Sequence, residues 1–101
     1  MRMLVDFELP TEPFNSYVRD GTAGERLGKI LEDLKPEAVY FSERNGKRGG
    51  TMIVEVASAS DIPRIAEPFF LTYDAEVHFR PCMTPEDLAQ AGLDALGEKW
   101  G

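Results

Sequence analysis

The sequence predicts an α+β domain in which helices cover one face of an antiparallel sheet, and three observations lead to this fold class. Two segments, residues 3–9 and 75–80, alternate between apolar and polar side chains with a period of two, as half-buried strands do. Between them, apolar residues recur at helical spacing in 22–34 and 58–69. An Asn-Gly pair at 45–46 separates two further strand-like runs and predicts a hairpin.

The first strand ends at Pro10, because proline lacks the N–H group that a sheet ladder requires. The segment from Thr11 to Gly21 fits a short helical turn, a lid or a plain loop. A helix is then predicted from Thr22, which with Glu25 has the spacing of a capping box. Its apolar stripe is Leu27, Ile30, Leu31 and Leu34, and Pro36 ends it.

The Asn-Gly pair fixes the register of the predicted hairpin, because both residues tolerate the positive φ angles of a type I′ turn. Centring the turn on this pair places Tyr40 opposite Thr51. It also places Phe41 opposite Gly50. This is the strongest local signal in the chain.

A second helix is predicted from Ser58, and Pro68 is expected to limit it to two or three turns. After the last strand, Thr84 and Pro85 have the pattern of an N-cap and a first helical residue. One final helix is therefore expected to run to about Trp100.

This order, β-α-β-β-α-β with an added C-terminal helix, predicts a ferredoxin-like sandwich that forms a single domain over residues 1–101. Right-handed connections place both crossover helices on the same face of the sheet. The expected core is Met3, Val5, Phe7, Val39, Phe41, Met52, Val54, Val56, Val77 and Phe79. The expected opposite face is Leu4, Asp6, Glu8, Tyr40, Ser42, Thr51, Ile53, Glu55, Glu76, His78 and Arg80.

Composition argues against several classes of partner. Eighteen acidic residues against eleven Lys and Arg give a net charge of −7, which repels nucleic acid and anionic membranes. The N-terminal segment lacks the pattern of a signal peptide, and the lone Cys82 suits a reducing compartment, so a cytoplasmic location is expected. No segment carries the motif of a cofactor or metal site, and none is predicted.

The polar face of the sheet holds the candidate site. His78, the only histidine, is the candidate catalytic residue because imidazole moves protons at neutral pH, although a salt-bridged interface histidine is the commoner role. The neighbouring Asp6 and Glu8 could share a metal or raise one another's pKa, or simply pair with Arg80. The candidate ligand-binding residues are Asp6, Glu8, Tyr40, Glu55, Glu76 and Arg80.

Apolar side chains among these charges predict a homodimer through the same face. Leu4, Tyr40 and Ile53 would be buried if a second copy of the sheet covered them. Two sheets meeting in this way would enclose a cavity lined by the charged residues. Trp100 is a second expected contact with the partner subunit.

The stretches 35–41, 66–71 and 83–88, together with the length and the order of elements, resemble the dimeric α+β-barrel superfamily and a group of small bacterial proteins of about this length. The resemblance implies a ferredoxin-like fold with paired sheets. Superfamily members include cofactor-independent monooxygenases, lactone isomerases, haem enzymes and ligand-binding regulatory modules. No catalytic motif of these groups is complete here, so no residue role is carried over.

Two functions of different classes follow from the sequence. The first is a homodimeric module that binds a small organic molecule or acts as an accessory protein without catalysis. The alternative is a cofactor-independent monooxygenase or isomerase that acts on a small organic substrate in a cavity on the sheet face. A purely structural interaction role is the third possibility.

Overall fold

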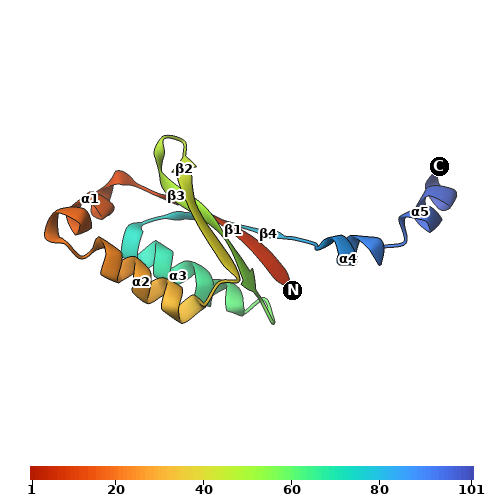
Figure 1. The fold of residues 1–101 in the computed structure, drawn as a ribbon, viewed down its shortest axis with the longest axis horizontal. Coiled ribbons are helices and arrows are strands. Elements are labelled where there is room, and N and C mark those ends of the chain that lie inside the picture. Colours follow the sequence, from red (N-terminus) through yellow and green to blue (C-terminus); the bar gives the residue numbers. More distant parts are fainter.

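The computed structural model describes residues 1–101 and contains a four-stranded antiparallel sheet and five helices (Figure 1). The strands are β1 (Arg2–Leu9), β2 (Ala38–Arg44), β3 (Lys47–Glu55) and β4 (Glu76–Pro81). The helices are α1 (Thr11–Asp20), α2 (Ala23–Leu34), α3 (Asp61–Tyr73), α4 (Pro85–Ala89) and α5 (Leu93–Trp100). The strand order across the sheet is β2-β3-β1-β4. None of the helices combines the length and apolarity needed to cross a membrane.

Strand β1 organises the core because it is paired on both sides and has one fully buried face. Val5 and Phe7 are 0% exposed, whereas the intervening Asp6 is only partly buried. Helices α2 and α3 cover the apolar face (Figure 1). The main core is Met3, Val5, Phe7, Leu9, Ile30, Leu34, Met52, Val54, Val56, Ile65, Phe69, Tyr73 and Ala75.

Most of the predicted core is confirmed, but Phe41 is not buried. Val39, Val77 and Phe79 are only partly buried against the core. Phe41 is 56% exposed because it lies on the edge strand β2, where its ring meets the edge of Phe7 at a centroid distance of 6.2 Å. The alternation of β2 therefore predicted correctly that Phe41 is on the apolar face of the sheet. It did not predict that this face is left exposed at the edge strand.

The predicted hairpin register is confirmed. Asn45 and Gly46 have φ angles of 53° and 77° between β2 and β3. Thr51 is the partner of Tyr40, and Gly50 is the partner of Phe41. A Cβ atom on Gly50 would lie 2.4 Å from the carbonyl oxygen of Tyr40, so glycine is required for the close pairing of these strands.

The helix starts predicted at Thr22 and Ser58 are wrong in detail. Thr22 precedes α2 but does not cap it with its side chain, because its hydroxyl donates to Asp20 Oδ1 at 2.6 Å. Helix α3 begins at Asp61 rather than after Ser58. It also continues through Pro68 for 13 residues, beyond the predicted two or three turns, since the turn after the proline buries Phe69 and Tyr73 completely.

The segment 11–20, for which the sequence left three alternatives open, forms helix α1. Its residue Glu12 is non-helical, so the helix is kinked near its start. The Tyr17 hydroxyl donates to the carbonyl oxygen of Thr72 at 2.7 Å, and the Phe14 ring lies 5.5 Å from that of Tyr73. These contacts attach α1 to the C-terminal end of α3.

The single C-terminal helix predicted by the sequence is instead two short helices that project from the sheet (Figure 1). The predicted N-cap at Thr84 is confirmed, and the structure shows that it forms a capping box with Asp87, with backbone-to-side-chain distances of 3.1 and 3.0 Å. Gly92, with φ 72°, separates α4 from α5. We call residues 82–101 the C-terminal arm. It makes the molecule long and narrow, with dimensions of 60 × 28 × 19 Å.

The close approach at Gly50 leads to a stability prediction. Gly50→Ala should lower the free energy of unfolding by about 1–3 kcal/mol, because the added methyl group overlaps the Tyr40 carbonyl and the Phe7 ring. Gly28→Ala is the matched control: it lies in α2 with nothing within 4 Å of an added Cβ, and should raise the free energy of unfolding by about 0.5–1 kcal/mol. Urea unfolding measures both. Equal effects of the two substitutions would contradict the register.

Candidate functional site

Three strands bring the predicted polar residues together on the face of the sheet opposite the helices. In the register of the sheet, Asp6 on β1 lies between Thr51 on β3 and His78 on β4. Glu8 pairs with Glu76 in the same ladder. The expectation that the polar residues of β4 approach those of β1 is therefore confirmed.

Asp6 is the centre of a hydrogen-bonded group that we call the Asp6 cluster, formed with Arg44, Thr51 and Arg80. Its Oδ1 accepts from Arg44 Nη2 at 2.9 Å and from Thr51 Oγ1 at 2.5 Å. Its Oδ2 accepts from Arg80 Nη1 at 2.5 Å. One carboxylate thus holds two guanidinium groups that come from strands on either side of β1.

These contacts keep Asp6 ionised. The hydrogen bond from Thr51, followed by those from Arg44 and Arg80, lowers the pKa of Asp6 from its ordinary value of 3.8 to about 2. The alternative in which Asp6 and Glu8 raise one another's pKa is wrong for Asp6. A carboxylate with so low a pKa does not accept protons near neutrality, and its two oxygens hold the two arginines in place through hydrogen bonds.

Glu8 belongs to a second, adjoining set of contacts at the hairpin. Asn45 Nδ2 donates to Glu8 Oε1 at 2.7 Å, and Lys47 Nζ lies 4.0 Å from Glu8 Oε2. No group of three or more His, Cys, Asp or Glu side chains is arranged to hold a metal ion.

A small hollow of about 150 Å³ opens between these two sets of contacts. It is lined by Asp6, Phe7, Glu8, Arg44, Asn45, Glu76, His78 and Arg80. Five of the seven residues predicted for the site thus line one hollow. His78 is exposed there, and its imidazole forms no hydrogen bond within the protein.

The two other predicted site residues lie outside the hollow. Glu55 accepts from the N-terminal amine of Met1 at 2.5 Å. Tyr40 projects from the edge strand and is 73% exposed.

Sequence reasoning missed Arg44 and Asn45 as site residues because both were assigned only to the turn. The available signal was the register, since a hairpin centred on the Asn-Gly pair places its last residues beside the polar residues of β1. Strand pairing alone does not show that the long side chain of Arg44 on β2 extends across β3 to Asp6 on β1.

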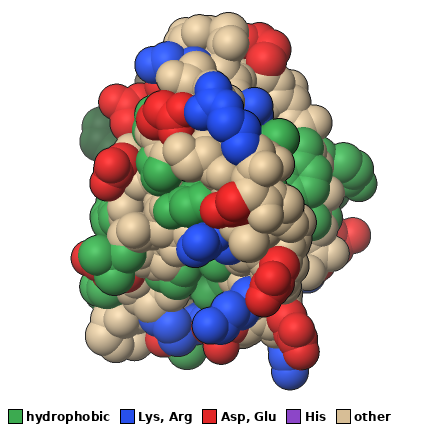
Figure 2. Space-filling model, turned by 90° about the vertical axis from the view of Figure 1, so that its left-hand side faces the viewer, with side chains coloured by type: hydrophobic (Ala, Val, Ile, Leu, Met, Phe, Trp, Pro, Cys, Tyr) green, Lys and Arg blue, Asp and Glu red, His purple; other side chains and the backbone are tan.

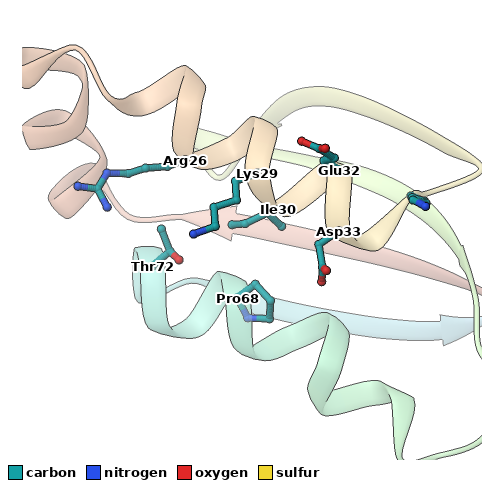
Figure 3. Close-up of a pocket in the computed structure, with 8 residues that line it drawn as sticks. Arg26, Lys29, Ile30, Glu32, Asp33, Pro68 and Thr72 are labelled. Atoms are coloured by element: carbon teal, nitrogen blue, oxygen red, sulfur yellow. The ribbon is translucent and has the colours of Figure 1, made fainter.

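A larger hollow of about 680 Å³ lies between α2 and α3, on the other side of the molecule (Figure 3). Its walls mix basic residues, such as Arg26 and Lys29, with the acidic Glu32 and Asp33. The Arg26 guanidinium is already placed over the Tyr17 ring, at 3.9 Å from its centroid. Ligand pockets are usually lined mainly by hydrophobic side chains, whereas Ile30 is the one hydrophobic residue among the eight that line this hollow.

Comparison with known proteins gives evidence on the fold. No family model matches the chain, and a search of curated proteins also finds no match. The solved structure of 5-chloro-2-hydroxyhydroquinone dehydrochlorinase (TftG) from Burkholderia phenoliruptrix AC1100, in complex with 2,5-dihydroxybenzoquinone, has a TM-score of 0.55 and 19% sequence identity to this chain. The alignment covers 86% of this chain and 99% of TftG. The de novo designed protein Ferredog-Diesel has a TM-score of 0.45 at 12% identity, over 80% of this chain and 85% of the design.

At such low identity these likenesses concern the fold alone. The likeness to TftG, together with the four-stranded antiparallel sheet, fits an α+β ferredoxin-like fold. The predicted α+β class with a four-stranded antiparallel sheet is confirmed.

The low pKa of Asp6 leads to a prediction for stability against pH. Because folding lowers this pKa, Asp6 stabilises the fold above its unfolded pKa, and the contribution is lost as pH falls toward the folded value of about 2. The free energy of unfolding of Asp6→Asn should therefore be about 1–2 kcal/mol below that of the wild type near neutral pH. This range takes into account that water screens the ion pair with the exposed Arg80.

The difference in unfolding free energy between the two proteins should shrink between about pH 5 and pH 2, as measured by chemical denaturation. Asp94→Asn in α5 is the control, because its carboxylate has no partner in the structure. A difference for Asp6→Asn that stays constant over this range would contradict the proposed ion pairs.

Proposed function

We propose that the protein is a homodimeric module that binds a small organic anion on the polar face of its sheet. The observation that carries this proposal is the Asp6 cluster, in which Arg44 and Arg80 share one carboxylate and line the same hollow. The three charged groups together have a net charge of +1. Glu8 and Glu76 also line the hollow, so its lining as a whole has a formal charge of −1, and the positive charge is confined to the two guanidinium groups.

The arginines have donors to spare for a ligand. A guanidinium has five N–H donors in a rigid plane, and Asp6 accepts from a single nitrogen of each. Arg44 also donates to the Glu43 carbonyl oxygen and to Thr51 Oγ1, so most of the free donors belong to Arg80. The Arg80 side chain is 62% exposed, so its remaining donors can reach a carboxylate or a phenolate oxygen. Asp6 supports this arrangement because it stays charged and fixes the orientation of both guanidinium groups.

A second copy of the chain supplies the missing wall in this proposal. The hollow of about 150 Å³ is smaller than the ~300–1,000 Å³ of ordinary ligand pockets. Leu4 and Ile53 are paired across β1 and β3 on the same face, and Tyr40 is exposed beside them. Pairing two such faces would remove these apolar groups from water and enclose the arginines, which supports a symmetric homodimer.

The second candidate is a cofactor-independent monooxygenase or isomerase that uses the same cavity. The specific observation in its favour is His78, which lies exposed at the hollow between Glu76 and Arg80 along β4. In this version His78 removes a proton from an activated C–H or a phenolic O–H, and Arg80 stabilises the resulting anion.

The binding proposal predicts loss of ligand affinity when a cluster arginine is removed. Suitable probes are benzoate and 2,5-dihydroxybenzoquinone, the ligand in the TftG structure, which carries acidic hydroxyl groups. Isothermal titration calorimetry should detect binding of at least one probe to the wild type. Arg80→Met should weaken it by about tenfold or more, because a charged hydrogen bond is lost.

Arg64→Met is the matched control, since Arg64 lies on α3 and pairs with Asp61 on that helix. It should leave the affinity unchanged. Equal affinity in Arg80→Met and the wild type would contradict a site at the Asp6 cluster.

The enzymatic version makes a separate prediction about His78. Incubation with hydroquinones in air, followed by oxygen uptake and mass spectrometry of the products, tests turnover. His78→Ala should reduce turnover by about 100-fold or more if His78 is the general base, while leaving probe affinity within about twofold. Turnover that is unchanged in His78→Ala would rule out this role, and an absence of any turnover would favour the binding module.

A further inference from the structure

The C-terminal arm exposes apolar side chains that nothing in the chain covers. Every residue from 85 to 101 is exposed, and Trp100 is 76% exposed. The last backbone contact between the arm and the sheet is the bond from Cys82 N to the Arg2 carbonyl oxygen. The exposed apolar residues of the arm are Met83, Leu88, Leu93, Leu96 and Trp100. Helices as short as α4 and α5 are marginal in water without packing, so the arm requires a surface to dock on.

A groove with matching properties lies at the other end of the molecule. We call it the hairpin groove: it has a volume of about 580 Å³ and lies between α1, α2 and the β2–β3 hairpin. Its apolar residues are Leu9, Phe14, Leu27 and Phe41. Figure 2 shows this end of the molecule, where hydrophobic side chains lie exposed among charged ones.

Two basic side chains border the groove. Arg48 is held in place, because it donates to Asn15 Oδ1 at 2.7 Å and its guanidinium lies 4.6 Å from the centroid of the Phe14 ring. Lys47 lies beside it, and Glu43 is the only acidic residue of the lining. The arm is acidic, with Glu86, Asp87, Asp94 and Glu98 against Lys99. The charges of the arm and the groove are therefore complementary.

The arm does not reach the groove of its own chain, since α5 and α1 lie at opposite ends of the long axis (Figure 1). We propose that the C-terminal arm of each subunit docks in the hairpin groove of a second copy. This inference rests on the proposed homodimer and adds a second contact to it.

The topology permits both arms to dock at once. The arm leaves the sheet beside Arg2, where β1 begins, whereas the groove includes Leu9, where β1 ends. A two-fold axis perpendicular to the strands reverses the strand direction in the second copy. It thereby brings each arm to the end of the partner at which the groove lies, as an isologous interface requires. The groove is on the helix-covered side of the sheet, so the arm passes round the end of the partner's sheet to reach it.

Trp100 is the only tryptophan, so its fluorescence reports on the arm alone. With the full-length protein, the emission of Trp100 should shift to shorter wavelength as the concentration rises. Analytical ultracentrifugation over the same range should show the mass of a dimer. Phe41→Asp, at an exposed position of the groove, should remove the shift and weaken dimerisation by about tenfold or more.

Leu71→Asp is the matched control, because Leu71 is exposed on α3 outside both the groove and the polar face; it should behave as the wild type. Leu96→Asp places the charge on α5, all of whose residues are exposed, so it should not disturb the core; it should weaken dimerisation as Phe41→Asp does.

A dimer in which Trp100 remains water-exposed, with Phe41→Asp having no effect, would overturn arm docking while leaving the sheet-face dimer intact. A blue-shifted Trp100 in a monomer would also overturn it, because the arm would then fold onto its own chain. The anion site is tested independently, by comparing the affinity of Arg80→Met for benzoate with that of the wild type.

Discussion

The alternation of β1 is the constraint on which both faces of this protein depend. With strands paired on either side and helices beneath it, β1 must direct Val5 and Phe7 into the core. Because successive side chains of a strand point to opposite faces, Asp6 and Glu8 are then directed to the other side. A shift of one residue in register would bury two carboxylates and expose a phenylalanine, so the register of the core also fixes the polar site.

The sequence predicted those parts of the fold that depend on local chemistry. Period-two alternation and the Asn-Gly turn were enough to pair the strands and to place most of the polar residues together. The errors arose where tertiary packing decides. Phe41 is on the apolar face of the sheet, but on the edge strand β2 the helices do not bury it. Helix α3 continues past Pro68 because the residues that follow are buried. Gly92 divides the tail into two helices, which the apolar spacing alone did not reveal.

The chain leaves two surfaces uncovered, and the proposed homodimer would cover both. The polar face combines a positive Asp6 cluster with exposed apolar neighbours, while the acidic arm and the basic hairpin groove lie at opposite ends of the molecule. A domain of about 100 residues buries a modest core, so the proposed contacts between subunits would add to its stability. In the proposed homodimer the two subunits would enclose the ligand site together, and the arginines held by Asp6 would favour an anionic ligand group.

A high-resolution crystal structure of the protein as purified is the most direct measurement of this arrangement. We expect a two-fold assembly whose sheets face one another, with electron density for an anion on the free N–H donors of Arg44 and Arg80. A monomer with its polar face open to water would contradict the account. So would a dimer in which side chains of the partner fill the space beside the arginines, because no ligand could then enter.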